Sequence, residues 1–119
     1  MTPAHSIADG DCLRTATASI LDLNPRRVPH FIERMRKDDY WVDVWAAWLR
    51  KRGLRPVRHC INTLADAPKG WWIAITDEDP FDYETHALVM RGRRVAFDAQ
   101  ENPPLRRNYI EGYTLEPLA

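Results

Sequence analysis

Residues 86–98 read HALVMRGRRVAFD. Two apolar runs flank a short basic connection that contains Gly92, and this pattern predicts a β-hairpin. If the chain turns near Gly92, residues equally far from the turn lie opposite each other. His86 and Asp98 are then expected to face each other across the open end of the hairpin and to point to the same face of the sheet.

The rest of the second half also predicts strands. Residues 55–61 and 71–76 carry β-branched and aromatic side chains, and a polar loop separates them. Residues 109–115 are a candidate for a last strand.

The first half of the chain shows helical spacing instead. Apolar side chains recur three or four positions apart across residues 13–23, which predicts an amphipathic helix. Asn24 should end it, because the residue before a proline is pushed out of the α region. A second amphipathic helix is predicted over residues 42–53, and a short charged helical turn over residues 34–37.

Helices first and antiparallel strands second predict the α+β class. With 119 residues the chain has the usual size of one domain, so residues 1–119 are expected to form a single domain. Hydrophobic residues make up 45% and charged residues 29% of the chain, which is ordinary for a globular protein and unlike a disordered one. The tryptophans are expected in the core or in the wall of a cleft.

The charge balance and the N-terminus narrow the classes of function. The chain has 17 Lys plus Arg and 17 Asp plus Glu, so no global field attracts nucleic acid or an anionic membrane. Residues 1–11 lack a basic segment followed by an apolar run, so we expect no secretion signal. No apolar run is long enough to span a bilayer. The two cysteines are therefore expected to be reduced thiols in the cytoplasm.

Cys12 follows a Gly-Asp pair, which offers possible helix caps, and stands at the predicted start of the first helix. The positive end of a helix dipole and its free N–H groups favour a thiolate, the reactive form of cysteine. The same N–H groups are able to hold the negative oxygen of a tetrahedral intermediate. Cys12 is therefore the candidate nucleophile, against the alternative of a small buried hydrophobe. Cys60 is assigned to the core, and no spacing supports a metal site or another cofactor.

A thiolate nucleophile needs a base, and the chain has four histidines. His5 lies near the N-terminus and His30 beside a proline, so surface or capping roles are expected for both. His59 is expected to be a partly exposed strand residue that points away from Cys60. His86 differs, because it starts an apolar strand opposite Asp98. That carboxylate is expected to accept the Nδ1–H of the imidazole and to leave Nε2 facing the thiol; the alternative is an ordinary cross-strand polar pair.

These residues together resemble a known family. Residues 10–23 and 28–31 are similar to the opening of small papain-like cysteine peptidases found in phages and bacteria, which have a Gly-Asp-Cys helix and a Val-Pro-His-Phe connection. The family pattern continues with a Trp-bearing helix that ends in Gly, and with a late His-Ala strand followed by Asp on the next strand. Residues 41–53, 86–89 and 97–98 match these later pieces in the same order.

The resemblance implies a papain-like fold, with N-terminal helices packed on a C-terminal antiparallel sheet. It also implies catalytic roles for Cys12, His86 and Asp98. The expected activity is that of a cysteine hydrolase that cleaves an amide, isopeptide or thioester bond in a peptide, a protein or a small acyl substrate. No cofactor, nucleic acid or membrane is expected as a partner.

One position of the family pattern is not filled. Papain-like enzymes place a Gln shortly before the Cys to complete the oxyanion hole, but the only Gln of this chain is Gln100. His5, Ser6, Asp9 or backbone amides are the candidates to replace it. The alternative function is a papain-like binding module with weak or no catalysis, such as a phage-encoded protein that acts on a host factor. A third alternative, ranked last, is nucleic-acid binding through the arginine clusters.

Overall fold

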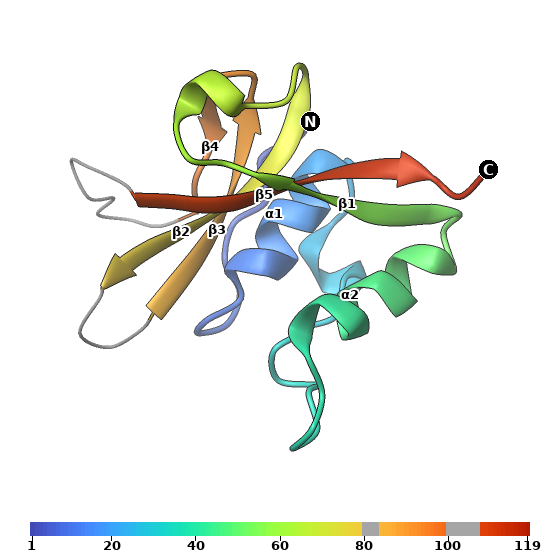
Figure 1. The fold of residues 1–119 in the computed structure, drawn as a ribbon. Coiled ribbons are helices and arrows are strands. Elements are labelled where there is room, and N and C mark those ends of the chain that lie inside the picture. Colours follow the sequence, from blue (N-terminus) through green and yellow to red (C-terminus); the bar gives the residue numbers. More distant parts are fainter. Residues whose placement is uncertain (80–83, 100–107) are drawn as a thin grey trace.

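The computed structural model describes residues 1–79, 84–99 and 108–119. Within them, two α-helices lie on one side of a five-stranded antiparallel sheet (Figure 1). The helices are α1 (Cys12–Ile20) and α2 (Trp41–Arg50), with short 3₁₀ turns η1 (Pro25–Arg27) and η2 (Leu64–Asp66). The strands are β1 (Leu54–Cys60), β2 (Trp71–Asp79), β3 (Glu84–Arg91), β4 (Arg94–Phe97) and β5 (Asn108–Pro117), in the sheet order β1-β5-β2-β3-β4. The α+β class and the predicted strands are confirmed; Gln100 lies outside the described residues.

Helix α1 ends earlier than its apolar spacing predicts. Its last helical residue is Ile20, and Asp22 adopts a left-handed φ of 57°. The Leu23 N–H then donates to the Ala18 carbonyl at 2.8 Å, and the Asp22 N–H donates to the Ser19 carbonyl at 3.3 Å. These two bonds satisfy carbonyls at the helix end in the manner of a Schellman motif. The prediction that Asn24 ends the helix was therefore wrong, because the chain had already reversed.

The connection from α1 to α2 contains the short 3₁₀ turn η1 and further turns, but no α-helix. The charged helical turn predicted over residues 34–37 is wrong: hydrogen-bonded turns stand at 31–34 and 37–38. The Arg36 N–H donates to the Asp39 side chain at 2.8 Å, which offers the backbone an alternative to a helical bond. Helix α2 is confirmed, and Gly53, with a φ of 75°, turns the chain into β1 three residues after the helix ends.

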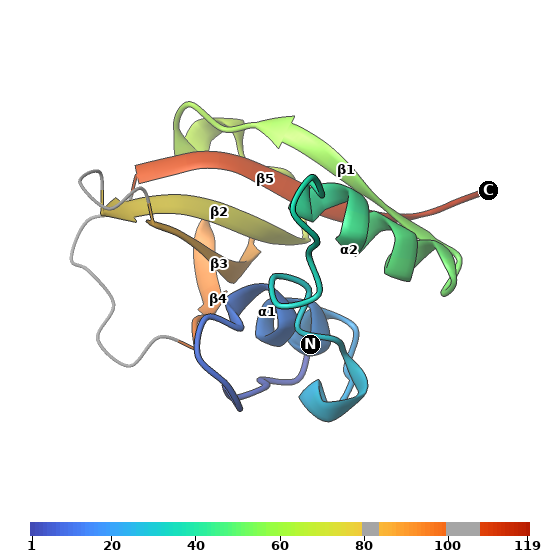
Figure 2. The same cartoon turned by 90° about the horizontal axis from the view of Figure 1, so that it is seen from below.

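The core lies on both faces of the sheet. On the helix side, α1 packs against β3 and β2, and α2 packs against β1 (Figure 2). Trp45 and Leu49 of α2 are 0% exposed, and they pack in one cluster with Ile73, Val89 and Tyr113 of the sheet. On the other face of the sheet, where η2 lies (Figure 1), Leu64 and Ala67 pack against a smaller apolar cluster. Its buried members are Ile61, Trp72, Ala74, Leu88 and Met90.

The β3–β4 hairpin has a different register from the predicted one. Its turn has two residues, since Arg91 pairs with Arg94, and Gly92 has a positive φ of 56°. An irregularity between Met90 and Val89 then shifts the pairing, so that Val89 lies opposite Phe97. Extended by one residue, this register places Asp98 opposite Leu88, two positions along β3 from His86. The predicted direct opposition of His86 and Asp98 was therefore wrong; the two are diagonal neighbours.

None of the helices in the described ranges is both long and apolar enough to cross a membrane.

Candidate active site

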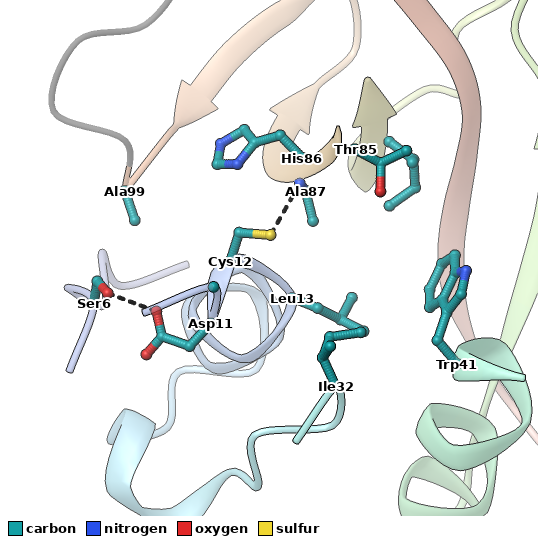
Figure 3. A pocket seen from close by; sticks show the side chains of 12 residues that line it. Ser6, Asp11, Cys12, Leu13, Ile32, Trp41, Thr85, His86, Ala87 and Ala99 are labelled. Atoms are coloured by element: carbon teal, nitrogen blue, oxygen red, sulfur yellow. Dashed lines mark hydrogen bonds between the residues drawn. The ribbon is translucent and has the colours of Figure 1, made fainter. Parts of the chain in front are cut away.

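A pocket of about 590 Å³ opens where the start of α1 meets the start of β3, with α2 at its far wall (Figure 3). It brings together Cys12 and His86, which are far apart in the sequence. Its lining consists of Ser6, Gly10, Asp11, Cys12, Leu13, Ile32, Trp41, Ile75, Thr85, His86, Ala87 and Ala99. The predicted nucleophile and base therefore share one cavity, with an apolar wall beside them.

Cys12 is the first residue of α1 and is only partly buried. Its sulfur accepts a hydrogen bond from the Ala87 N–H at 3.4 Å (Figure 3). Among the described residues, β4 pairs with β3 only as far as Val89, so the start of α1 can approach the edge of β3 at Ala87. A backbone N–H aimed at sulfur stabilises negative charge there. Cys12 is therefore not a buried filler of the core.

Asp11 stands at the N-cap position of α1, but its carboxylate makes no cap hydrogen bond. It is 3% exposed and accepts from the Ser6 hydroxyl at 2.6 Å and from the Ile7 and Ala8 N–H groups at 3.0 and 3.2 Å. The Arg14 guanidinium lies 3.8 Å away. The prediction that this turn caps the helix is therefore wrong for Asp11: its side chain binds residues 6–8 instead, and no described side chain caps the first-turn amides of α1.

His86 and Asp98 form a close hydrogen-bonded pair. The imidazole Nε2–H donates to Asp98 Oδ1 at 2.6 Å, and the two side chains are only 14% and 8% exposed. The expected pair is present, but the expected nitrogen was wrong, because the carboxylate takes Nε2 and leaves Nδ1. The diagonal placement of Asp98 explains why it meets Nε2 and not Nδ1. Asp98 lies nearer the hairpin turn than a residue directly opposite His86 would, so its carboxylate approaches the ring from that side.

The surroundings of His86 strongly favour its charged form. Burial lowers its pKa, but the hydrogen bond to Asp98 and then hydrogen bonding and charge attraction with Cys12 outweigh burial and raise the pKa to about 10. The attraction of the Asp98 carboxylate adds in the same direction. His86 is therefore an imidazolium at neutral pH, which is the state that stabilises a thiolate beside it.

Replacing Asp98 with Asn is expected to lower the pKa of His86 from about 10 toward its ordinary value of 6.5. A neutral amide accepts a hydrogen bond more weakly than a carboxylate and carries no charge. Because the folded-state pKa is raised, the stability that this proton contributes is complete below about pH 6.5 and is lost as the pH rises through about 10. The loss of stability between these two values should therefore be smaller in the variant than in the parent chain.

The direct measurement is an NMR titration of the His86 ring protons in both proteins. His59 is an internal control in the same spectra, since its Nε2 pairs with the Thr114 hydroxyl at 2.9 Å, away from the pocket. An identical His86 midpoint in parent and Asp98→Asn would contradict the assigned role of the carboxylate.

The other histidines and Cys60 do not join the pocket. His5 is exposed, as predicted, and its ring lies edge-on to Phe97. His59 is partly exposed, as predicted. Cys60 is exposed on β1, so its assignment to the core was wrong; this strand is at the edge of the sheet and its residues alternate between a covered and an open side.

His30 departs furthest from its prediction. It is buried, with 4% exposure, so the surface alternative was wrong. Its Nδ1 accepts a hydrogen bond from the Glu33 N–H at 3.3 Å. This contact caps the turn that follows, so the predicted capping role is correct for one of the two ring nitrogens. Its Nε2 contacts the Asp9 carbonyl at 2.9 Å, three residues before Cys12.

Several residues of the site had no signal in the sequence. The burial of Asp11, the aim of the Ala87 amide and the pocket position of Ile32 all depend on how distant segments meet. Trp41 was expected in the core or in a cleft wall, and it lines the pocket. In the described ranges, no group of three or more His, Cys, Asp or Glu side chains is arranged to hold a metal ion.

Searches with this chain against protein-family models, curated proteins and solved structures gave no match.

Proposed function

We propose that this chain is a papain-like cysteine hydrolase that cleaves an amide, isopeptide or thioester bond with Cys12 as nucleophile, His86 as acid and base, and Asp98 as the residue that orients His86. The observation that carries the proposal is the sharing of one pocket by Cys12 and a His86 that is paired with Asp98 at 2.6 Å. The substrate is a peptide, a protein or a small acyl compound. A thiol enzyme of this kind would act in a reducing compartment, the cytoplasm.

In the first half of the reaction, the Cys12 thiolate attacks the carbonyl carbon and forms a C–S bond, while the carbonyl oxygen takes the negative charge. His86 then gives its Nδ1 proton to the leaving amine or thiol as the bond to it breaks. The products of this half are the free leaving group, an acyl-thioester on Cys12 and a neutral imidazole.

In the second half, the neutral imidazole takes a proton from water, and the resulting hydroxide bonds to the acyl carbon. The C–S bond breaks, the acid product leaves, and the Cys12 thiolate and the His86 imidazolium are restored. Asp98 holds Nε2–H throughout, so Nδ1 stays directed at the reacting atoms.

The proposal predicts a reactive thiol at Cys12. At pH 7 an ordinary thiol is only a few per cent thiolate, so Cys12 is expected to react with iodoacetamide about tenfold faster than a free model thiol. The exposed Cys60 provides an internal comparison, since it lies outside the pocket. Mass spectrometry of tryptic peptides gives the two rates separately.

The control is Cys12→Ala, in which the fast labelling should vanish and the Cys60 rate should persist. Labelling of Cys12 no faster than that of Cys60, and unchanged in His86→Ala, would count against a cysteine hydrolase.

A further inference from the structure

His30 connects the segment before α2 to the segment before Cys12. Because the Glu33 N–H donates to Nδ1, the ring proton is on Nε2, and Nε2–H donates to the Asp9 carbonyl at 2.9 Å. The ring is 4% exposed, so these bonds are largely shielded from water. The proposed mechanism uses neither nitrogen of this buried ring.

The bond from His30 fixes the orientation of the Asp9–Gly10 peptide. No peptide bond in the described part of the chain is cis, and in a trans peptide the C=O and the N–H point in opposite directions. With the Asp9 carbonyl held on His30, the Gly10 N–H is directed away from His30. Gly10 lines the pocket, and its N–H donates to no group among the described residues.

A second free donor lies two residues further on. The Cys12 N–H is at the uncapped start of α1 and has no acceptor among the described residues, because the Asp11 carboxylate is held by Ser6, Ile7 and Ala8. Gly10 has a φ of 67° and Asp11 a φ of −97°. Such an alternation turns nearby N–H groups toward one side and is typical of backbone concavities that hold anions.

We propose that His30 is a positioning residue that aims the Gly10 N–H at the oxyanion, so that the Gly10 and Cys12 amides together replace the missing glutamine. This inference rests on the proposed hydrolase function. His30 touches no reacting atom; it acts only through the Asp9–Gly10 peptide. Ser6, another candidate for the vacant position, is engaged elsewhere: its single O–H donates to the Asp11 carboxylate at 2.6 Å, and the same hydroxyl oxygen lies 2.9 Å from the Ala8 carbonyl.

Two substitutions of His30 separate its two hydrogen bonds. In His30→Gln the side-chain amide N–H stands near the place of Nε2 and keeps the donor to Asp9. In His30→Asn the shorter side chain reaches only the place of Nδ1, so the Glu33 contact is kept and the Asp9 contact is lost. The matched controls are His59→Gln and His59→Asn, at a histidine outside the pocket.

Each variant is tested with two reagents in a Cys60→Ser background. Iodoacetamide alkylates the thiolate by displacement of iodide and forms no oxyanion. In acylation by p-nitrophenyl acetate, Cys12 sulfur bonds to the carbonyl carbon, the oxygen becomes negative, and p-nitrophenolate leaves. The alkylation rate therefore reports the thiolate and a folded site, and the acylation rate also reports the oxyanion donors.

We expect His30→Asn to lose at least about tenfold in the acylation rate, since loss of a whole oxyanion donor costs on the order of 10²- to 10³-fold. Its alkylation rate should be unchanged. His30→Gln should retain the parent acylation rate within about threefold, and both His59 variants should match the parent in both reactions. Equal acylation rates in His30→Asn and His30→Gln, or equal losses in both reactions, would overturn the positioning role.

A second experiment uses only the parent chain, so its result does not depend on whether the His30 variants fold. N-acetyl-phenylalaninal bonds through its carbonyl carbon to Cys12 sulfur and leaves its oxygen at the oxyanion position. The Gly10 amide resonance should shift in this adduct and should not shift after alkylation by iodoacetamide. A Gly10 resonance that does not change when the aldehyde binds overturns the inference. If the parent chain is acylated no faster than Cys12→Ala, the proposed hydrolase function itself fails. If the parent is acylated faster but the Gly10 resonance does not shift in the aldehyde adduct, only the role of His30 fails.

Discussion

A His86→Ala variant is expected to hydrolyse p-nitrophenyl acetate on the order of 10²- to 10⁴-fold more slowly than the parent chain at pH 7, which is the range that a positioned acid–base group contributes. The substitution removes two contributions. In the proposed mechanism, the imidazolium that stabilises the Cys12 thiolate is lost, and so is the base that takes a proton from water during hydrolysis of the acyl-thioester. The steady release of p-nitrophenolate measures the rate.

Two control variants give the background rate and the full rate for this measurement. Cys12→Ala should give the background rate, because no acyl-thioester forms without the sulfur. His59→Ala should equal the parent, because its ring pairs with Thr114 and lies outside the pocket. A parent chain no more active than Cys12→Ala would favour the alternative of a papain-like binding module. A His86→Ala variant as active as the parent would mean that the His86–Asp98 pair has a structural role and no catalytic one.

A Trp45→Ala variant is expected to lose about 3 to 5 kcal/mol of unfolding free energy, the cost of removing a large aromatic side chain from a core. Trp45 is 0% exposed, stacks on Trp41 with ring centroids 5.9 Å apart and meets the Tyr113 ring edge-on at 5.3 Å. Its Nε1–H donates to the Thr17 hydroxyl at 3.1 Å, which links α2 to α1. Since a domain has only about 5 to 15 kcal/mol in total, the variant should be close to unfolding.

Urea unfolding followed by far-UV circular dichroism measures this loss. Trp71→Ala is the matched control, since Trp71 is 36% exposed and its ring is covered on one side by the Arg91 guanidinium at 5.0 Å. Its loss should be below about 1 kcal/mol, as for an exposed cation–π contact. Equal losses in the two variants would contradict the central position of Trp45 in the core. Because Trp41 lines the pocket and stacks on Trp45, we also expect a less ordered pocket wall in Trp45→Ala.

The positions of the helices and strands follow closely from the sequence, because they depend on periodicity within short segments. The apolar run at 71–76 and the hairpin at 86–98 are strands in the structure, and α2 contains the predicted apolar face. The errors lie where a local hydrogen bond competes with the pattern. The reversal at Asp22 ends α1 early, and the side chain of Asp39 takes the backbone N–H that a helical turn before α2 would have used.

The candidate site was predictable in its members and not in its geometry. Cys12 was identified by its place at a helix start, and His86 and Asp98 by their symmetry about Gly92. The pairing shift between Met90 and Val89 could not be foreseen, because residues 95–97 are all apolar and show no alternation that would mark an extra residue. That shift is why Asp98 meets Nε2 and why Nδ1 is left for the sulfur.

The sequence by itself determined the α+β class, the order of its elements and the three residues that we propose for catalysis, because these depend on local spacing and on residue chemistry. The tertiary structure alone decided which polar groups are buried and what each of them contacts. His30 meets the Asp9 carbonyl, and the Ala87 amide meets the Cys12 sulfur, across 21 and 75 residues of chain. The physical reason is that a hydrogen bond depends on the meeting of two specific atoms, and loop paths that carry no periodic signal bring those atoms together.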